Sequence, residues 1–494
     1  MNKTVINDVG ASCPLYVDLD GTLTLTDTLM ESVLLLVRRC PLNLLRLLAW
    51  LPLGKAAFKR RMADAVRPDP ALLPYHERFV QHLMDERERG RPLVLVSAAD
   101  ARIVHEVADH LGLFDDALGT GAQGPNLSGE HKREAIEAHA RARGHARWAY
   151  AGNSRDDLAV WRGAAEAIAV NASRGVVSAL RRQHPQARVF ERAPPSLRTV
   201  LRAIRLTQWS KNALLFMPLL AAHSLDPEAW HRVLLAFLAF GLCASATYLV
   251  NDLLDLPSDR RHRLKRHRPL AAGALGIAQA VLLGLLLMML AFVLAWQVLA
   301  GLAGLAGMLL LYTATALAYS LYLKRQPLID VLVLASLYTL RVGAGAIAAH
   351  VALSNWLLAI SMFLFLSLSL VKRCAELEAL AAQARPAPPG RGYQVRDLVT
   401  LRAMGMAAGF GAVMVLALYI DSEKGREHYH QPEWLWVAAP LVLLWVMRIW
   451  LKTGRRELHD EDPLQFALHD GFTWMMVLLI GGVGLVATLG LGTA

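Results

Sequence analysis

The chain has 494 residues, of which 55% are hydrophobic, and its mean hydropathy is +0.34. This composition excludes an ordinary soluble protein and indicates membrane-spanning segments, which begin at about residue 200. The net charge of +11 could indicate nucleic-acid binding, but the basic residues lie mostly between apolar runs, which favours retention on the cytoplasmic side of a membrane instead.

The first predicted elements are short apolar strands that end in polar groups. Residues 15–22 read LYVDLDGT, so an apolar run ends in Asp18 and Asp20 before a glycine turn. Further polar groups follow later strands or turns in this part of the chain: Ser97, Lys132 and Asp157. Because the ends of parallel strands meet at one edge of a sheet, we expect these groups to form one site.

This pattern resembles the haloacid dehalogenase (HAD) superfamily of phosphohydrolases over about residues 13–193. The resemblance implies an α/β, HAD-like Rossmannoid domain that uses Mg²⁺ and covalent carboxylate catalysis. It implies these roles: Asp18 as nucleophile, Asp20 as acid/base, Ser97 and Lys132 on the phosphate, and Asp18, Asp20 and Asp157 at the metal. Asn153 stands where the family often has Asp, so an active phosphatase and a retained scaffold both remain open.

Residues 29–88 are long enough for a helical cap on this domain. Within them, LNLLRLLAWLPLG at 42–54 is very apolar but too interrupted for a membrane span. We expect a buried cap helix there; the alternative is a face that rests on the membrane or on the C-terminal, apolar part of the chain. Pro194 and Pro195 mark a linker at 194–200. The four cysteines are scattered, so we expect neither a disulfide framework nor a zinc site.

Apolar runs over residues 201–494 predict an all-α polytopic membrane domain of about nine transmembrane helices. We place them near 205–222, 230–250, 274–298, 300–320, 328–349, 354–372, 401–420, 434–451 and 472–491. With a cytoplasmic N-terminus, sixteen Lys and Arg fall in inner loops and two in outer loops. This bias predicts an integral protein of the inner membrane with its N-terminal domain in the cytoplasm.

An acidic segment, NDLLDLPSD, follows the second predicted span. Asn251, Asp252, Asp255 and Asp259 recur at helical spacing, and Lys265 and Arg268 come next. Three carboxylates beside a bilayer would repel one another, and Mg²⁺ with a diphosphate would remove that cost because hard cations take carboxylate and phosphate oxygens. A charged loop that merely closes a membrane hairpin is the alternative.

The acidic segment resembles that of the UbiA superfamily of intramembrane transferases, over roughly residues 200–494. The resemblance implies nine transmembrane helices and a Mg²⁺-diphosphate site at two Asp-rich segments. The second segment departs from the family pattern, because Asp330 is followed four residues later by Leu334 instead of a second Asp. Asp330 remains a predicted metal ligand, while the usual prenyl-diphosphate chemistry comes into doubt.

Several further motifs resemble the decaprenyl-phosphate phosphoribosyltransferase branch, among them QWSKN, LRVGAGA and KRCAELEAL. This resemblance implies transfer of 5-phosphoribose from its soluble diphosphate to a polyprenyl phosphate. Candidates for binding the phosphates are Lys211, Asn251, Lys265, Arg268, Lys324 and Arg341. The HAD-like domain would then remove the 5-phosphate. Prenyl transfer to an aromatic or other acceptor, and a membrane scaffold with a decayed HAD head, remain alternatives. The sequence leaves the oligomeric state open.

Overall fold

The computed structural model describes residues 13–121, 124–191, 195–298, 304–382, 392–458 and 463–489. Pro194 of the predicted linker and most of the loop at 382–392 lie outside these residues. The chain divides into two compact units. The first, called the N-terminal unit below, is Met1–Ile204 with Leu249–Leu282, and the second, the membrane unit, is Arg205–Tyr248 with Leu283–Ala494.

The N-terminal unit contains one sheet of six parallel strands in the order β3-β2-β1-β4-β5-β6. The strands are β1 (Leu15–Asp18), β2 (Leu93–Asp100), β3 (Asp116–Thr120), β4 (Ala149–Gly152), β5 (Glu166–Val170) and β6 (Arg188–Phe190). The strand order reverses at β1, which lies between β2 and β4, and parallel sheets bind ligands at such a reversal. The predicted Rossmannoid α/β fold is confirmed.

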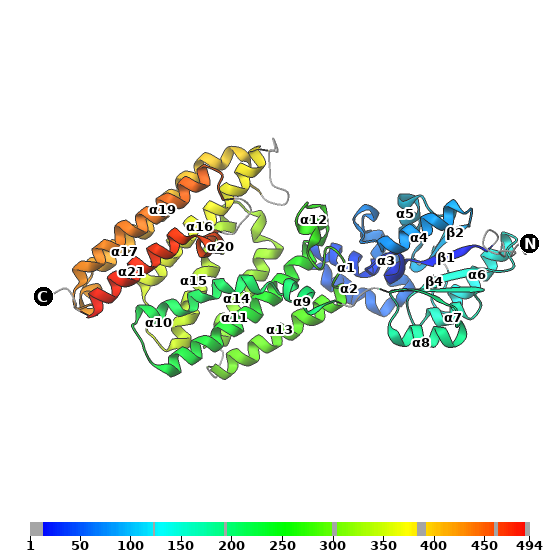
Figure 1. Ribbon diagram of the computed structural model, residues 1–494, viewed down its shortest axis with the longest axis horizontal. Helices are drawn as coiled ribbons and strands as arrows, with labels where there is room; N and C mark the ends of the chain where they lie inside the picture. Colours follow the sequence, from blue (N-terminus) through cyan, green and yellow to red (C-terminus); the bar gives the residue numbers. More distant parts are fainter. Residues whose placement is uncertain are drawn as a thin grey trace, which may run out of the picture. The chain divides into compact units, whose positions relative to one another are not determined.

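Helices cover both faces of this sheet (Figure 1). α4 (Glu77–Glu88) and α5 (Ala101–Leu111) pack on one face, and α6 (Glu130–Ala142), α7 (Asp157–Trp161) and α8 (Arg174–Gln183) pack on the other. Successive side chains of a strand point to opposite faces, so Leu15 and Val17 enter the first core and Tyr16 enters the second.

Three helices form the cap: α1 (Thr28–Arg39), α2 (Asn43–Trp50, continued by the turn η2, Leu51–Leu53) and α3 (Lys55–Ala65). Asp27 begins α1, because its carboxylate accepts the backbone N–H groups of Leu29 and Met30. A small apolar cluster joins the three helices: Leu36, Leu47, Met62 and Val66.

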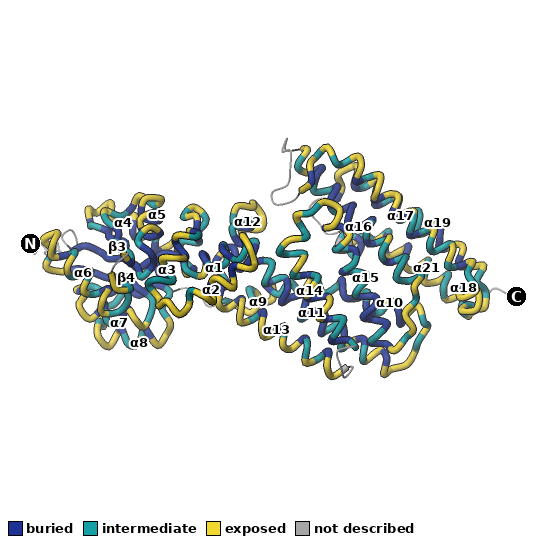
Figure 2. Tube along the Cα trace, turned by 180° about the vertical axis from the view of Figure 1, so that it is seen from behind, coloured by how far each residue is buried: buried dark blue, intermediate teal, exposed yellow. Residues whose placement is uncertain are grey.

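The burial expected for residues 42–54 is wrong. Within α2 only Asn43 and Leu47 are buried, whereas Leu45 is 64% exposed and Leu48 is 61% exposed. Figure 2 draws most of this helix as exposed. Asn43 and Leu47, four residues apart, and the half-buried Trp50 hold the helix on the cap, so the remaining leucines of α2 stay mostly exposed.

Seven helices in the described part of the chain are long and apolar enough to cross a membrane: Pro227–Leu254, Ile277–Gln297, Ile329–Ala349, Asn355–Ala382, Val395–Asp421, Pro432–Gly454 and Gly471–Leu489. As helices they are α11 (Pro227–Leu254), α13 (Ile277–Val298), α15 (Ile329–Ala349), α16 (Asn355–Ala382), α17 (Leu398–Asp421), α19 (Ala438–Gly454) and α21 (Gly471–Leu489). α14 (Leu305–Leu321) is apolar but shorter, at 17 residues.

The first predicted span is not one long helix. Residues 206–221 form a 3-10 segment, η4 (Leu206–Phe216), followed by the short helix α10 (Met217–Ala221). The remaining short helices connect the long ones: α9 (Leu197–Ala203), α12 (Leu256–Arg261), α18 (Glu423–His428) and α20 (Pro463–His469). The predicted all-α membrane domain is confirmed, with seven candidate spans among the described residues where about nine were predicted.

Candidate active sites

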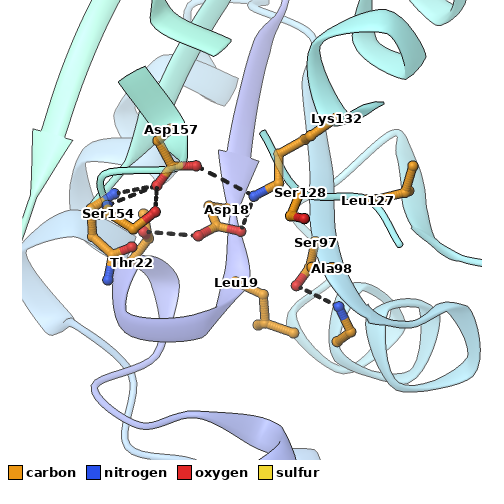
Figure 3. Close-up of polar contacts among 12 residues, drawn as sticks. Asp18, Leu19, Thr22, Ser97, Ala98, Leu127, Ser128, Lys132, Ser154 and Asp157 are labelled. Carbon is orange, nitrogen blue, oxygen red and sulfur yellow. Dashed lines mark hydrogen bonds and ion pairs between the residues drawn. The ribbon is translucent and has the colours of Figure 1, made fainter. Parts of the chain in front are cut away.

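Asp18 is the last residue of β1 and is buried at the carboxyl edge of the sheet. Lys132 from α6 donates to its Oδ1 at 2.8 Å, and the Thr22 hydroxyl lies 3.5 Å from Oδ2 (Figure 3). Lys132 is itself only 5% exposed, so this ion pair is shielded from water. The sequence prediction that these two residues meet is confirmed.

Asp157 also contacts Lys132, at 3.5 Å from its Nζ (Figure 3). Its second oxygen accepts the backbone N–H groups of Asn153 and Ser154 and the Ser154 hydroxyl, at 2.8–3.0 Å. The Tyr150 hydroxyl donates to Asp157 at 2.6 Å and accepts from Lys132 at 3.0 Å. Tyr150 therefore connects the lysine to this carboxylate, a role that nothing in the motif indicated.

These contacts set the charges of the site. Burial raises the pKa of Asp18 to about 6, against the attraction of Lys132. Burial disfavours the charged form of Lys132, but Asp18 and Asp157 outweigh it and raise the pKa of the lysine. Burial also opposes ionisation of Asp157, yet Lys132 and the hydrogen bonds from Tyr150 and Ser154 lower its pKa. At neutral pH the site holds a protonated lysine between two carboxylates.

Asp20 lies in the turn that follows β1, and its Oδ1 accepts the backbone N–H of Thr28 at 2.8 Å. Burial, with Asp27 and Asp18 nearby, raises the pKa of Asp20 to about 7. A carboxyl group with this pKa can both give and take a proton near neutral pH, which suits general acid–base chemistry.

Gly21 gives this turn its shape. Its φ is +75°, and a Cβ there would lie 2.1 Å from Nδ2 of Asn153. The glycine of the DGT motif is therefore favoured for two reasons: its backbone is in the left-handed region, and the Asn153 side chain approaches it closely. As a result, the amide of Asn153 lies against the turn that carries Asp18 and Asp20.

The other edge of the site comes from β2 and the cap. Ser97 is 1% exposed, and its hydroxyl accepts the backbone N–H of Ala99 at 3.1 Å (Figure 3). Lys59 from α3 donates to the carbonyl of Ala98 at 2.6 Å and to Oδ1 of Asn126 at 2.9 Å. Burial lowers the pKa of Lys59. Sequence analysis missed Lys59, because only folding brings α3 beside the residue that follows Ser97.

Mg²⁺ is the metal that the HAD resemblance implies here. Among the described residues, no three Asp, Glu, His or Cys side chains are grouped to hold a metal ion. The donors at the site are nevertheless oxygens, and Mg²⁺ in proteins often takes one or two carboxylates with waters and substrate phosphate. Asp18, Asp20 and the amide oxygen of Asn153 fit that pattern. The oxygens of Asp157 already accept several hydrogen bonds, so its metal role stays a prediction.

The acidic segment also folds into a cluster within the N-terminal unit. Arg268 Nη1 lies 3.2 Å from Asp252 and 2.7 Å from Asp259, and both carboxylates are buried. The two acids, seven residues apart, thus converge on one cation. Asn251 and Asp255 are half-buried, while Lys265 is exposed in the turn η5 (Lys265–His267). Two carboxylates around one positive centre fit a hard divalent cation.

In the membrane unit, Arg341 of α15 is buried and held by three hydrogen bonds. They run to Asn212 Oδ1 at 2.9 Å, to the carbonyl of Leu337 at 2.7 Å and to the hydroxyl of Tyr312 at 2.8 Å. Lys211 is also buried, and both its ammonium and the Arg341 guanidinium lie within 6 Å of the Tyr338 ring centre, at 5.8 and 5.6 Å. Two predicted phosphate-binding cations therefore lie around one aromatic ring.

A glycine makes this arrangement possible. A Cβ on Gly345 would lie 2.0 Å from the carbonyl oxygen of Leu215, so η4 and α15 touch backbone to backbone. This close approach carries Asn212 of η4 to within hydrogen-bonding distance of Arg341. The small residues of LRVGAGA thus allow the two segments to pack closely, while Arg341 before them forms hydrogen bonds with the surrounding polar groups.

Asp330, the predicted second metal ligand, is fully buried at the start of α15. Arg373 Nε lies 2.8 Å from its Oδ2, and the Tyr393 hydroxyl donates to its Oδ1. Arg373, in turn, pairs with Glu376. A guanidinium therefore neutralises Asp330, and its metal role stays a prediction. Lys324 is half-buried in the turn η6 (Leu323–Arg325) that follows α14.

Comparison with known proteins identifies both parts of the chain. A model described as the UbiA prenyltransferase family matches residues 213–477, and one described as haloacid dehalogenase-like hydrolase matches residues 15–162. The chain is 36% identical over 490 residues to y4nM, an uncharacterized protein of Sinorhizobium fredii, covering 96% of this chain and 91% of that protein.

Two further similarities concern the membrane part. Decaprenyl-phosphate phosphoribosyltransferase of Mycobacterium tuberculosis is 38% identical over 183 residues, which cover 36% of this chain and 60% of that protein. A structure of a UbiA homolog from Archaeoglobus fulgidus bound to GPP and Mg²⁺ covers 58% of this chain and 99% of its own, with 17% identity and a TM-score of 0.45. The chain belongs to the UbiA prenyltransferase family, as an integral membrane protein with an N-terminal HAD domain.

Proposed function

We propose that this protein is a bifunctional enzyme of the inner membrane. Its membrane part transfers 5-phosphoribose from phosphoribosyl diphosphate to a polyprenyl phosphate, with Mg²⁺ as cofactor. Its HAD domain, on the cytoplasmic side, then removes the 5-phosphate. The observation that carries the transferase half is the 38% identity to a decaprenyl-phosphate phosphoribosyltransferase. The chain spans 60% of that relative's length.

The state of Asp330 supports phosphoribosyl over prenyl transfer. Position 334 is Leu, so the second acidic segment offers one carboxylate, and the Arg373 guanidinium lies 2.8 Å from it. One buried carboxylate that pairs with one guanidinium has little net charge left to attract a metal ion, whereas two carboxylates share the single guanidinium of Arg268 in the first acidic segment. The remaining acidic cluster, with Asp252 and Asp259, suits a single diphosphate leaving group.

In the transfer step, an oxygen of the lipid phosphate attacks the anomeric carbon of ribose. The bond from that carbon to the diphosphate breaks, and diphosphate leaves with the electron pair. The attacking phosphate is already an anion, so positioning and charge stabilisation are the main tasks of the protein. Mg²⁺ would supply the neutralising charge for the leaving diphosphate at Asp252 and Asp259. Lys211 and Arg341 are cations that suit the binding of phosphate groups in an apolar surrounding.

In the HAD domain, a carboxylate oxygen of Asp18 attacks phosphorus and the bond to the sugar oxygen breaks. Asp20, with its pKa near 7, donates the proton that this oxygen needs. Water, deprotonated by Asp20, then releases phosphate and restores Asp18. Lys132, paired with Asp18 at 2.8 Å, holds the attacking carboxylate and offsets the charge of the phosphoryl group. The product of the first reaction carries a phosphomonoester, which is the substrate class of this site.

Purified protein in lipid vesicles, with Mg²⁺, polyprenyl phosphate and phosphoribosyl diphosphate labelled in the ribose, tests both steps. Label in the organic phase establishes phosphoribosyl transfer. The Asp18→Asn variant should give a labelled lipid that keeps its 5-phosphate, whereas the unaltered protein should give a lipid without it. Absence of labelled lipid, with turnover of a prenyl diphosphate instead, would overturn the donor assignment. Equal products from both proteins would overturn the role of the HAD domain.

A further inference from the structure

The helix α2 with the turn η2 carries an apolar surface that the fold of the N-terminal unit leaves uncovered. We call it the leucine face and define it by six leucines that are 44–71% exposed: Leu42, Leu44, Leu45, Leu48, Leu51 and Leu53. Single exposed leucines are ordinary, but six within twelve residues form a contiguous patch of the kind that marks an interaction surface.

The leucine face and the side of α2 that packs on the cap are different sides of the helix. Asn43 and Leu47, one helical turn apart, point into the cap, and the Asn43 amide donates to the carbonyl of Leu36 at 2.9 Å. Leu44, Leu48 and Leu51 repeat at spacings of four and three residues on another side of the helix. α2 therefore carries apolar residues on an outward side in addition to Leu47 and Trp50 on the side that packs on the cap, whereas a helix that serves only its own domain keeps its outward side polar.

The charges around the leucine face are of one sign. Between Glu31 and Asp64, residues 32–63 contain seven Lys or Arg and no Asp or Glu. Arg39 and Arg46 are exposed near the start and the middle of α2, and Lys55 is exposed just after η2. An apolar helix face rimmed by cations is complementary to a bilayer with anionic headgroups, where the leucines enter the acyl boundary and the cations meet phosphate.

Contacts inside the N-terminal unit place α2 close to the end of a membrane-spanning helix. Arg38, near the end of α1, donates to the Ser258 hydroxyl at 3.1 Å, and Glu31 of α1 forms a buried pair with Arg260 at 2.7 Å. Ser258 lies four residues after Leu254, the last residue of α11. The chain then needs only three residues to pass from α1 into α2.

We propose that the leucine face is a membrane anchor, which lies in the interface of the bilayer that the apolar helices of this chain cross. Because the face belongs to a chain already inserted in that bilayer, its effective concentration at the lipid surface is high, and weak single contacts suffice. The anchor would hold the cap, and with it Lys59 of α3, at the lipid surface. The inference concerns attachment and does not depend on either proposed activity.

Site-directed fluorescence on the full chain tests this proposal. Cys40 is exposed and the other three cysteines are buried, so a Cys40→Ser background allows one label at a chosen position. An environment-sensitive fluorophore is attached to Leu45→Cys or Leu48→Cys, and to Gln81→Cys on the exposed side of α4 as the control. The protein is reconstituted in phosphatidylcholine vesicles that contain phosphatidylglycerol, with and without a lipid that carries a quencher on its acyl chain.

We expect blue-shifted emission at positions 45 and 48 that the lipid quencher reduces several-fold, and unshifted, unquenched emission at position 81. Replacing Arg46 by Glu should weaken the quenching at position 48, because it reverses one of the charges that meets the headgroups. A blue shift without lipid quenching would mean that protein, from this chain or a second copy, covers the face. Emission like that of position 81 would mean exposure to water. Either result would overturn the proposal.

Discussion

The Tyr150→Phe substitution tests whether the hydroxyl of this buried strand residue positions the phosphatase site. The change removes one oxygen, which donates to Asp157 at 2.6 Å and accepts from Lys132 at 3.0 Å. Lys132 keeps its contact with Asp18 at 2.8 Å, so the site should loosen without collapsing. Hydrogen bonds to charged groups contribute about 1.5–3 kcal/mol each, and the remaining partners recover part of this.

We therefore expect kcat/KM to fall by about 10- to 100-fold, since each factor of ten corresponds to about 1.4 kcal/mol. The assay is hydrolysis of p-nitrophenyl phosphate by the full chain with Mg²⁺. Most of the loss should be in kcat, because Lys132 acts on the attacking carboxylate of Asp18 and on the developing charge.

Tyr16→Phe is the matched control. Tyr16 is equally buried, pairs with Tyr150 in register on the neighbouring strand β1, and packs in the same core. Its hydroxyl bonds to His139 at 2.8 Å, away from Asp18. This variant should keep its activity to within about threefold, a free-energy difference of less than about 1 kcal/mol. Equal losses in the two variants, or full activity of Tyr150→Phe, would refute the positioning role.

Three further predictions test other parts of the molecule. Asp252→Ala should abolish lipid labelling while the protein still inserts into membranes. Turnover in this variant would contradict the assignment of the acidic cluster to the transfer site. Arg91→Met should lower the stability of the HAD domain by about 3–5 kcal/mol, because it leaves buried Glu86 without the guanidinium 2.8 Å away. Arg89→Met removes an exposed contact with the same Glu86 and should cost less than about 1 kcal/mol in the same thermal unfolding series; equal shifts would contradict the burial argument. Gly21→Ala should lower phosphatase activity, because a Cβ would strain the backbone φ of +75° and displace the Asn153 amide, whose Nδ2 would lie 2.1 Å away. Normal p-nitrophenyl phosphate turnover would contradict this.

The sequence by itself determined the two-part plan and much of the site in the HAD domain. Apolar strands that end in Asp18 and lead into Asp157 predict a parallel sheet with its polar groups at one edge, because strand ends must meet there. Recurring apolar runs predict membrane helices, because the width of the bilayer sets their length. The helical spacing of the acidic segment predicts that its carboxylates lie near one another. In the structure α11 ends at Leu254 and α12 begins at Leu256, so Asp252 and Asp259 meet at Arg268 across a break between two helices.

Only the tertiary structure decided how these groups are held. Tyr150 and Lys59 have no signal in the sequence, because an ordinary strand tyrosine and an ordinary helix lysine reach the site only through packing. The pairing of Asp330 with Arg373 joins α15 to α16 across 43 positions of sequence, and no local pattern encodes such a contact. The leucine face was expected to be buried, since apolar composition alone does not tell which side of a helix finds a partner. Burial depends on neighbouring elements, and only the assembled cap shows that Asn43 and Leu47 of α2 face inward while its other leucines face out.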